Sequence, residues 1–386
     1  MGRCHLAIHV AGTLLILMAC SGGDSVAPDP ADPLQLSGNP ADFRWELPPG
    51  VSPPPVPSDN PMSPAKVELG RRLFYDTRLS VNGGFSCASC HRQEFAFADA
   101  RNLSVGATGE VHPRNAIGLA NTGYQRSFGW AAPATTTLEV HAEIPMFGVS
   151  PVEMGLRGRE AALLAELQAV PLYRQLFASA FPSQRDPVTV PGIAQAIATF
   201  QRTLNAGESP VDRYRRGDPS ALSTSARRGM TVFEAKGCAA CHAGPDFTLA
   251  TQPGAGEAAF ANTGLYNIGG TGAYPARNRG LMETTGRAAD MGHMKIPSLR
   301  NVALTFPYGH DGSVGSLEAV IDNYARGGRL VQVGPHAGDG RDNPFKDPRV
   351  RGFPITSAER ADLVSFLQSL TDSTFVTNTR YANPWR

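Results

Sequence analysis

The pentapeptide CASCH occupies residues 87–91, and a second copy, CAACH, occupies residues 238–242. Two cysteines separated by two residues and followed directly by histidine form the attachment signature of a c-type haem. The thiols bond to the haem vinyl groups, and the histidine binds the iron from the proximal side. A redox CxxC pair or half of a zinc site needs neither the adjacent histidine nor the repeat. The sequence therefore predicts two covalently attached haems, one on Cys87, Cys90 and His91 and one on Cys238, Cys241 and His242.

The first 20 residues have the pattern of an export signal. An early arginine precedes an apolar stretch that is too short for a comfortable membrane span, and small residues follow. Residues 17–20 resemble a bacterial lipobox, which would make Cys20 the lipidated first residue of the mature chain. An ordinary cleaved signal with a free N-terminus is the alternative. We therefore expect a protein on the periplasmic side of a bacterial envelope, with membrane contact only through its N-terminal anchor.

Cysteine use and net charge exclude several classes of protein. Of the six cysteines, Cys4 leaves with the signal and Cys20 would carry lipid, so every remaining one belongs to a CxxCH motif. No disulfide is expected, although disulfides are the usual fate of exported cysteines. The formal net charge is +1 and there is no polybasic run, so no nucleic-acid partner is expected.

Composition divides the chain into a signal, a tether and two domains. Hydrophobic residues make up 41% of the chain, which is enough to form buried cores. The Pro-rich stretch after residue 20 is expected to be extended. The expected parts are the signal at 1–20, the tether at 21–60, an N-terminal cytochrome c domain at 61–215 and a C-terminal cytochrome c domain at 216–386.

A second repeat accompanies the CxxCH motifs. Gly70 and Phe74 precede the first motif, and Gly229 and Phe233 precede the second, each pair within a helical pattern. Each half also closes with an amphipathic helix whose apolar residues are spaced i, i+3 and i+7. These residues are Ile197, Phe200 and Leu204 in the first half and Leu363, Phe366 and Leu370 in the second.

Helix signals are frequent along the chain, and runs of alternating strand residues are not. Ser63, followed by proline, is an expected N-cap, and Thr356 opens a capping box. Further helices are expected at about 159–168 and 172–180. The predicted fold is all-α, with two c-type cytochrome domains, one haem each, and long loops.

The sixth ligand of each iron decides between an electron carrier and an enzyme. In an electron carrier, Met or His is the sixth ligand of both irons, whereas in an enzyme the sixth position of one iron is left free for the substrate. Spacing does not choose among the available side chains, and for any one of them a surface or core role is the commoner one. The candidates are Met291, Met294, His112, His141, His293, His310 and His336.

Three segments resemble the diheme cytochrome c peroxidase and MauG superfamily. They are RNAIGLAN at 114–121, PMFGVSPVEMG at 145–155 and KIPSLRNVALTFPYGHDGSVGSLEAVIDNYARGG at 295–328. The resemblance covers roughly residues 60–370 and is greatest for the MauG-like branch. The segment at 46–80 is similar to that of the methanobactin-associated diheme enzymes within this branch.

The resemblance implies that the first haem, on His91, is the site where peroxide binds. Glu153 would then be the distal acid/base residue. Most relatives carry a distal Gln where this chain has His141, so His141 is either a second acid/base residue or a ligand that closes the iron. Trp130 matches the tryptophan placed between the two haems. Asn115, Thr305 and Pro307 match the ligands of a calcium ion between the domains.

Tyr324 stands where the peroxidases carry the Met ligand of the second haem, and MauG-like enzymes also have Tyr there. A phenolate is a hard anionic donor that favours Fe(III) and Fe(IV), whereas a thioether favours Fe(II). The resemblance thus implies that the second haem stores an oxidising equivalent. A packing role on the helix after Ser316 is the alternative.

Three functions are consistent with the sequence. The first is a MauG-like oxidoreductase that reacts with hydrogen peroxide, forms a high-valent two-haem state and oxidises an exposed aromatic residue of a partner protein. Tryptophan is the leading candidate for that residue. The second is a diheme peroxidase that reduces peroxide with electrons from a small redox protein. The third is a non-catalytic diheme electron carrier, which Tyr324, Glu153 and Trp130 disfavour.

Overall fold

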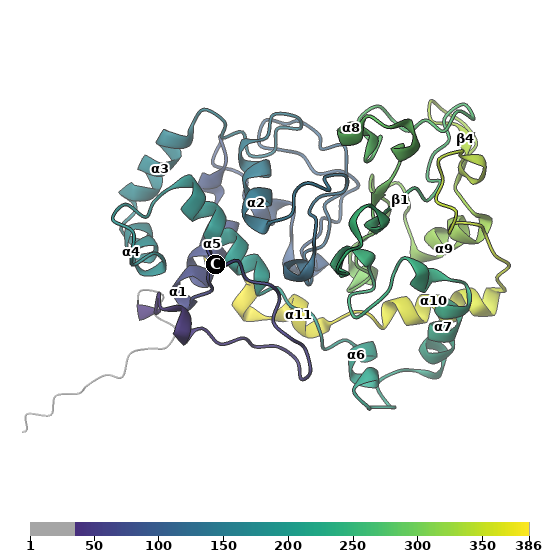
Figure 1. Cartoon of the computed structure of the whole chain (residues 1–386), viewed down its shortest axis with the longest axis horizontal. Coiled ribbons are helices and arrows are strands. Elements are labelled where there is room, and N and C mark those ends of the chain that lie inside the picture. The colour runs from purple at the N-terminus through teal and green to yellow at the C-terminus, as the bar shows by residue number, and fades with distance from the viewer. Residues whose placement is uncertain (1–34, 386) are drawn as a thin grey trace, which may run out of the picture.

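The computed structural model describes residues 35–385 (Figure 1). The expected signal and Cys20 lie outside this range. Within it, no helix is long and apolar enough to cross a membrane.

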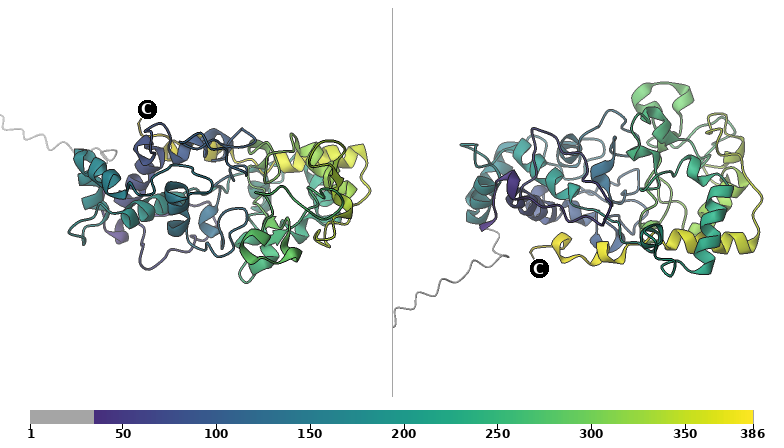
Figure 2. Two further views of the ribbon diagram at one scale, coloured as in Figure 1. Left: turned by 90° about the horizontal axis from the view of Figure 1, so that it is seen from above. Right: turned by 60° about the horizontal axis from the view of Figure 1, so that its bottom comes forward.

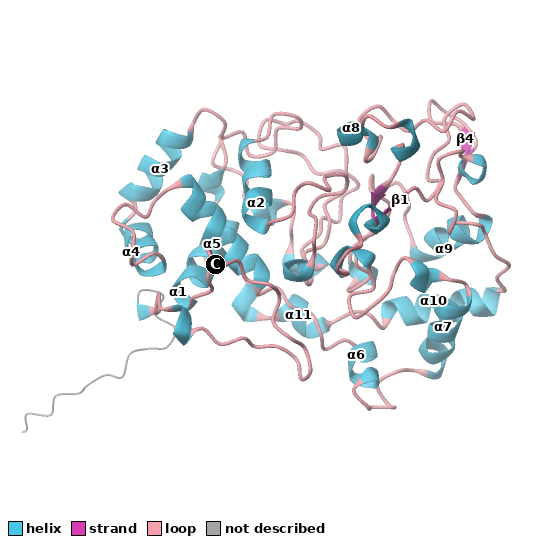
Figure 3. Cartoon of the chain, in the orientation of Figure 1, coloured by secondary structure: helices cyan, strands magenta, loops and turns pink. Residues whose placement is uncertain are grey.

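The described chain is helix-rich, with long connecting loops (Figure 3). The α-helices are α1 Pro64–Tyr75, α2 Leu138–Phe147, α3 Glu160–Ala169, α4 Pro171–Ala180, α5 Val190–Arg202, α6 Pro210–Arg215, α7 Thr224–Ala235, α8 Met282–Thr285, α9 Leu317–Arg326, α10 Ser357–Gln368 and α11 Ser373–Thr377. The 3-10 helices are Pro40–Asp42, Thr77–Leu79, Cys87–Ser89, Gln93–Phe95, Thr122–Tyr124, Cys238–Ala240, Leu249–Thr251, Gly256–Ala259, Ala288–Asp290, Val302–Leu304, Gly340–Asp342 and Thr379–Tyr381.

Short strands also occur, which the sequence did not predict. The antiparallel pairs are β1 Phe260–Ala261 with β2 Met294–Lys295, and β3 Leu330–Val331 with β4 Gly338–Asp339. Strands of two residues leave no alternating pattern in the sequence, so this difference has a simple cause.

Local helix signals predicted the ends of several helices. The Ser63 side chain accepts a hydrogen bond from the Lys66 backbone N–H at 3.3 Å and caps α1. Thr356 and Glu359 form the reciprocal capping box that starts α10. The expected helices at 159–168 and 172–180 are confirmed as α3 and α4.

The repeated glycines lie where two helices cross in each half of the molecule. A Cβ atom on Gly70 of α1 would lie 1.9 Å from the backbone oxygen of Ala196 in α5. A Cβ atom on Gly229 of α7 would lie 1.9 Å from the backbone oxygen of Asp362 in α10. Only glycine permits helices to approach so closely. The two halves are therefore built around the same helix pair, α1 with α5 and α7 with α10.

A pair of asparagines extends this correspondence. Asn121 and Asn301 both adopt the left-handed conformation, with φ of 57° and 58°. Their backbone N–H groups donate to the carbonyl oxygens of Leu204 at 2.9 Å and Leu370 at 3.0 Å, just beyond the ends of α5 and α10. Asparagine tolerates this conformation better than most residues. The internal repeat thus extends from the helix crossings to the loops after each CxxCH motif.

The two main hydrophobic cores do not divide the chain at residue 215, the expected boundary. Val211 of α6 already belongs to the C-terminal core. Phe375 of α11 and Tyr381 belong to the N-terminal core, beside Phe97. The chain therefore returns to the N-terminal half after α10, as the yellow segment in Figure 2 shows.

The described part of the tether, residues 35–60, packs against the N-terminal half, so ordered structure begins well before residue 61, the expected start of the N-terminal domain. The Ser37 carbonyl accepts from the Ala65 N–H at 3.0 Å. The Ser52 carbonyl accepts from the Tyr124 hydroxyl at 2.7 Å. Proline-rich segments lack a repeating pattern that would predict such docking.

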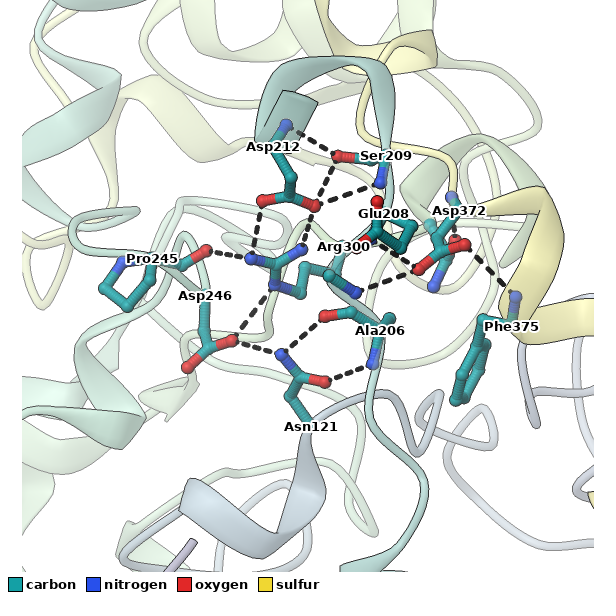
Figure 4. Close-up of polar contacts among 12 residues, drawn as sticks. Asn121, Ala206, Glu208, Ser209, Asp212, Pro245, Asp246, Arg300, Asp372 and Phe375 are labelled. Atoms are coloured by element: carbon teal, nitrogen blue, oxygen red, sulfur yellow. Dashed lines mark hydrogen bonds and ion pairs between the residues drawn. The ribbon is translucent and has the colours of Figure 1, made fainter. Parts of the chain in front are cut away.

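A buried polar cluster joins the two halves (Figure 4). The Arg300 guanidinium donates to both carboxylate oxygens of Asp212, at 2.8 and 3.0 Å, and to Asp246 at 3.0 Å. Asn121, from the N-terminal half, donates its side-chain N–H to the same Asp246 oxygen at 2.6 Å. Because each charge is paired and hydrogen-bonded, the cluster holds the halves in one arrangement.

Candidate functional site

The two CxxCH histidines are held by the same kind of hydrogen bond to a backbone carbonyl. The Nδ1 atom of His91 lies 2.7 Å from the Phe97 carbonyl oxygen, and that of His242 lies 3.0 Å from the Phe247 carbonyl oxygen. Both phenylalanines have a left-handed backbone, with φ of 61° and 51°. This conformation is rare for a bulky residue. A histidine that donates from Nδ1 keeps Nε2 free as a ligand, so both imidazoles suit an iron.

The four CxxCH thiols lie at the ends of these sites and are free cysteines. Cys87 and Cys238 begin short 3-10 helices. Burial raises the pKa of Cys87 to about 12 and that of Cys238 to about 11. A structural zinc site needs four Cys or His ligands, and in the described residues no such group lies together at either motif. These sites therefore fit attachment of haem better than a zinc ion.

In the C-terminal half the CxxCH residues open onto a cavity of about 550 Å³. Apolar side chains form much of its wall, and it is in the size range of cofactor sites. His242 and Tyr324 both line it. The Ser316 side chain caps α9, the helix that carries Tyr324, and burial raises the pKa of the phenol. The residues present fit a haem with a histidine and a tyrosine available to the iron.

Other predicted ligand candidates divide into two groups around this cavity. Met294 and His310 line it, as does Trp130. Met291, His293 and His336 do not form part of its wall. The Nε2 atom of His310 is buried without a hydrogen-bond partner in the described residues.

In the N-terminal half, Glu153 lies beside His112, near the cysteines of the first CxxCH motif. Its Oε1 atom is 3.8 Å from Nε2 of His112, and burial raises the pKa of the carboxyl to about 7. Burial, and then the charges of Lys295 and His91, lower the pKa of His141 to about 3. The Phe128 and His141 ring centroids lie 5.6 Å apart. A carboxyl with a pKa near neutrality can both accept and donate a proton at physiological pH.

Lys295 is a residue of this region whose importance the sequence did not reveal. It lies on β2, and its ammonium donates to the side-chain oxygen of Gln125 at 2.6 Å. Burial lowers its pKa to about 7. The only sequence signal was its position at the start of the 295–328 segment, because no pattern marks a lysine that will be buried.

Trp130 lies between two cavities. It lines the 550 Å³ cavity and also a smaller one of about 90 Å³. Its ring centroid is 6.4 Å from that of His310. The indole therefore lies beside both the C-terminal CxxCH cavity and the cavity that holds the expected calcium ligands.

The smaller cavity brings together the three residues expected to bind calcium, Asn115, Thr305 and Pro307. The Asn115 side-chain N–H group donates to the carbonyl oxygens of Arg101 and Asn102, at 3.0 and 3.2 Å, which leaves its amide oxygen available. Within residues 35–385 no group of three or more acidic, His or Cys side chains could hold a metal. An ion here would depend on neutral oxygen ligands, which calcium accepts.

Comparisons with known proteins identify the family to which the chain belongs. Residues 64–220 match the family of di-haem cytochrome c peroxidases. The methylamine utilization protein MauG of Methylorubrum extorquens is 35% identical over 365 residues, which cover 94% of this chain and 93% of that protein. The cytochrome-c peroxidase IdrP1 of Pseudomonas sp. is 33% identical over 84% of this chain and 85% of its own length.

A solved structure extends the comparison to the fold. It is described as a MauG-like protein associated with microbial copper homeostasis. It is 45% identical, has a TM-score of 0.85, and the match covers 89% of this chain and 100% of that one. Coverage this complete includes both CxxCH halves. The chain therefore belongs to the MauG and diheme cytochrome c peroxidase family, and it is a peroxide-dependent diheme oxidoreductase of the MauG-like branch.

Proposed function

We propose that this enzyme uses hydrogen peroxide to reach a high-valent two-haem state and then oxidises an aromatic residue on a partner protein. Tryptophan is the leading candidate for that residue. The observation that carries the proposal is Tyr324, which lines the same cavity as His242. An anionic oxygen ligand stabilises oxidised iron, whereas a high-potential haem that accepts electrons readily has a thioether.

The two halves would do different work. In the N-terminal half, Glu153 would move protons to and from peroxide, because its pKa of about 7 lets it act as base and acid near neutrality. His141 remains a candidate acid/base partner, since its low pKa keeps the ring neutral. The haems supply the redox chemistry, and Trp130 would pass electrons between them.

Because one similar solved structure is that of a MauG-like protein associated with microbial copper homeostasis, a substrate protein should be sought among proteins of copper homeostasis. A protein substrate of this kind would be exported, as the N-terminal signal of the present chain suggests. Calcium in the 90 Å³ cavity would fix the relation between the two halves.

The test is to load the enzyme with haem, add peroxide, and offer two substrates separately. One is an exported protein encoded beside the enzyme that carries an exposed tryptophan, and the other is a reduced small cytochrome. We expect mass changes on the tryptophan of the first and slow oxidation of the second. Fast peroxide reduction by the cytochrome, with no mass change on the protein, would favour the peroxidase function instead.

A further inference from the structure

A line of aromatic rings leads from the C-terminal cavity to the protein surface. Tyr274 lines the cavity itself, and its ring centroid lies 6.1 Å from that of His310. Tyr266 follows, with its centroid 5.5 Å from that of Tyr274 in an edge-to-face arrangement. The ring of His336 lies 5.5 Å beyond Tyr266. Electron transfer weakens steeply with distance, so rings in successive contact form a favourable route.

The line ends at the surface rather than in the core. Tyr274 and Tyr266 are buried, whereas His336 is partly exposed in the loop between β3 and β4. Val333 in the same loop is 83% exposed. The Arg329 guanidinium lies over the Tyr266 ring, 5.7 Å from its centroid. Tyr266 is therefore the last buried ring of this line before solvent, with 6% of its surface exposed.

Tyr266 also has a partner that can take its proton. Its hydroxyl donates to Asp311 Oδ2 at 2.5 Å. The phenolic proton can move along this charge-assisted hydrogen bond to the carboxylate. Oxidation of a phenol is far easier when the proton leaves with the electron, because a buried phenol radical cation is costly.

Tryptophan cannot serve this route. The chain contains three tryptophans, and Trp130 is the one that lines the cavity. Trp45 pairs with Phe43, and Trp385 lies near Tyr173 in the N-terminal half. On the outward side of the C-terminal cavity, the oxidisable rings in mutual contact are the two tyrosines.

We propose that Tyr274 and Tyr266 carry oxidising equivalents from the C-terminal haem site to the surface beside His336, with Tyr266 as the redox-active terminus. The proposal rests on the proposed function, because it supplies the path by which that oxidation reaches a protein substrate. In the forward step Tyr266 loses one electron through Tyr274 to the peroxide-oxidised enzyme, and its phenolic proton moves to Asp311. The neutral radical then takes one electron from the partner's aromatic ring and recovers its proton from Asp311. Two such cycles complete a two-electron oxidation.

The test uses the haem-loaded enzyme, stoichiometric peroxide and rapid freeze-quench EPR spectroscopy, with no partner protein. The wild type should show a tyrosyl radical signal that narrows when the protein is made with ring-deuterated tyrosine. Tyr266→Phe keeps the ring but removes the oxidisable hydroxyl, so this signal should be lost and the oxidised absorbance spectrum should persist at least five-fold longer. Asp311→Asn removes the proton acceptor and should also slow the decay.

Tyr173→Phe is the matched control, because the Tyr173 hydroxyl also donates to a carboxylate, that of Asp76, but in the N-terminal core. This variant should behave as the wild type. Absence of a tyrosyl radical signal while the wild type forms its oxidised state, or decay of Tyr266→Phe at the wild-type rate, would overturn the route. If Tyr266→Phe fails to retain haem, an unchanged decay rate in Asp311→Asn overturns it. A wild type that forms no oxidised state with peroxide would instead overturn the proposed function, and the route with it.

Discussion

The indole N–H of Trp130 donates a hydrogen bond to the backbone carbonyl oxygen of Asn115 at 2.7 Å. One residue therefore anchors the ring that lies beside the C-terminal haem cavity and also contributes to the wall of the expected calcium cavity. The Asn115 backbone N–H in turn donates to the His310 carbonyl at 2.7 Å, across the two halves. The proposed electron relay and the proposed calcium site are thus joined by two hydrogen bonds through Asn115.

Replacing Trp130 by Phe should separate the two haems electronically. The smaller ring loses the hydrogen bond to Asn115 and is harder to oxidise. We expect both haems to remain attached while the fraction of enzyme with both irons oxidised by peroxide falls at least ten-fold, as counted by Mössbauer spectroscopy. Trp385→Phe is the control, because this exposed indole also donates to a carbonyl, that of Arg72, far from the cavities. Equal two-iron oxidation in both variants would show that Trp130 is not the relay.

Removing calcium should slow electron transfer between the two haems and should leave both haems attached. Chelation would leave the oxygen of Asn115 and its neighbours in the 90 Å³ cavity without an ion to organise them. We expect slower electron sharing and lower activity, restored by added calcium, with unchanged haem content. Full activity in the metal-free wild type would remove this role for the ion.

Much of the architecture could be predicted from sequence because it is recorded in local patterns. The CxxCH motifs and the capping residues Ser63 and Thr356 depend on neighbours within a few residues. The return of Phe375 to the N-terminal core and the docking of residues 35–60 depend on partners hundreds of residues or a domain away. No short-range pattern encodes such contacts.

The residues of the candidate site also fall into two groups, those that the sequence indicated and those that it did not. The resemblance to a family supplied Glu153 and Tyr324, which composition and spacing alone would have left as ordinary residues. It did not supply the proximity of His112 to Glu153 or the burial of Lys295. These depend on how loops fold over the haem sites, and loop conformation is the part of a chain that periodicity describes least.

The activity should depend on pH through Glu153. Burial raises the pKa of this carboxyl to about 7, so the base form is gained as pH rises through that value. The rate of peroxide-driven oxidation should rise with the same midpoint, and Glu153→Gln should lower it by about 10²–10⁴-fold and flatten the profile. Glu166→Gln, an exposed change on α3, is the control. A wild-type profile that is flat between pH 6 and pH 8 would contradict the assignment.

The same shift predicts an effect on stability. A folded-state pKa above the unfolded value means that the stabilising contribution is present at low pH and is lost as pH rises to about 7. Glu153→Gln should therefore be more stable than the wild type at pH 8 and similar to it at pH 4. Urea unfolding at the two pH values measures this, and a variant less stable at pH 8 would contradict it.

Removing Arg300 should destabilise the junction between the halves. Its partners Asp212 and Asp246 are buried, so Arg300→Met leaves two uncompensated carboxylates and should cost about 3–5 kcal/mol of unfolding free energy. Arg228→Met breaks an ion pair with Asp362 whose arginine is 59% exposed and should cost less than about 1 kcal/mol. Urea unfolding compares the variants, and equal losses would mean that the buried cluster is not what holds the halves together.

Replacing Tyr324 by Met tests the division of labour between the haems. Tyr324 and His242 line one cavity, and a thioether cannot stabilise oxidised iron as an anionic oxygen does. The two-iron oxidised state should form poorly or decay fast, and the reduction potential of the second haem should rise. Peroxide would still reach the His91 site and Glu153 would still move its protons, so peroxide reduction with an external donor should survive. Partner oxidation should fall by orders of magnitude in the same protein. Tyr308→Met, a change at another tyrosine of the cavity wall, controls for altered packing. If both activities persist unchanged in Tyr324→Met, Tyr324 is not a functional iron ligand and the second haem does not store the oxidising equivalent.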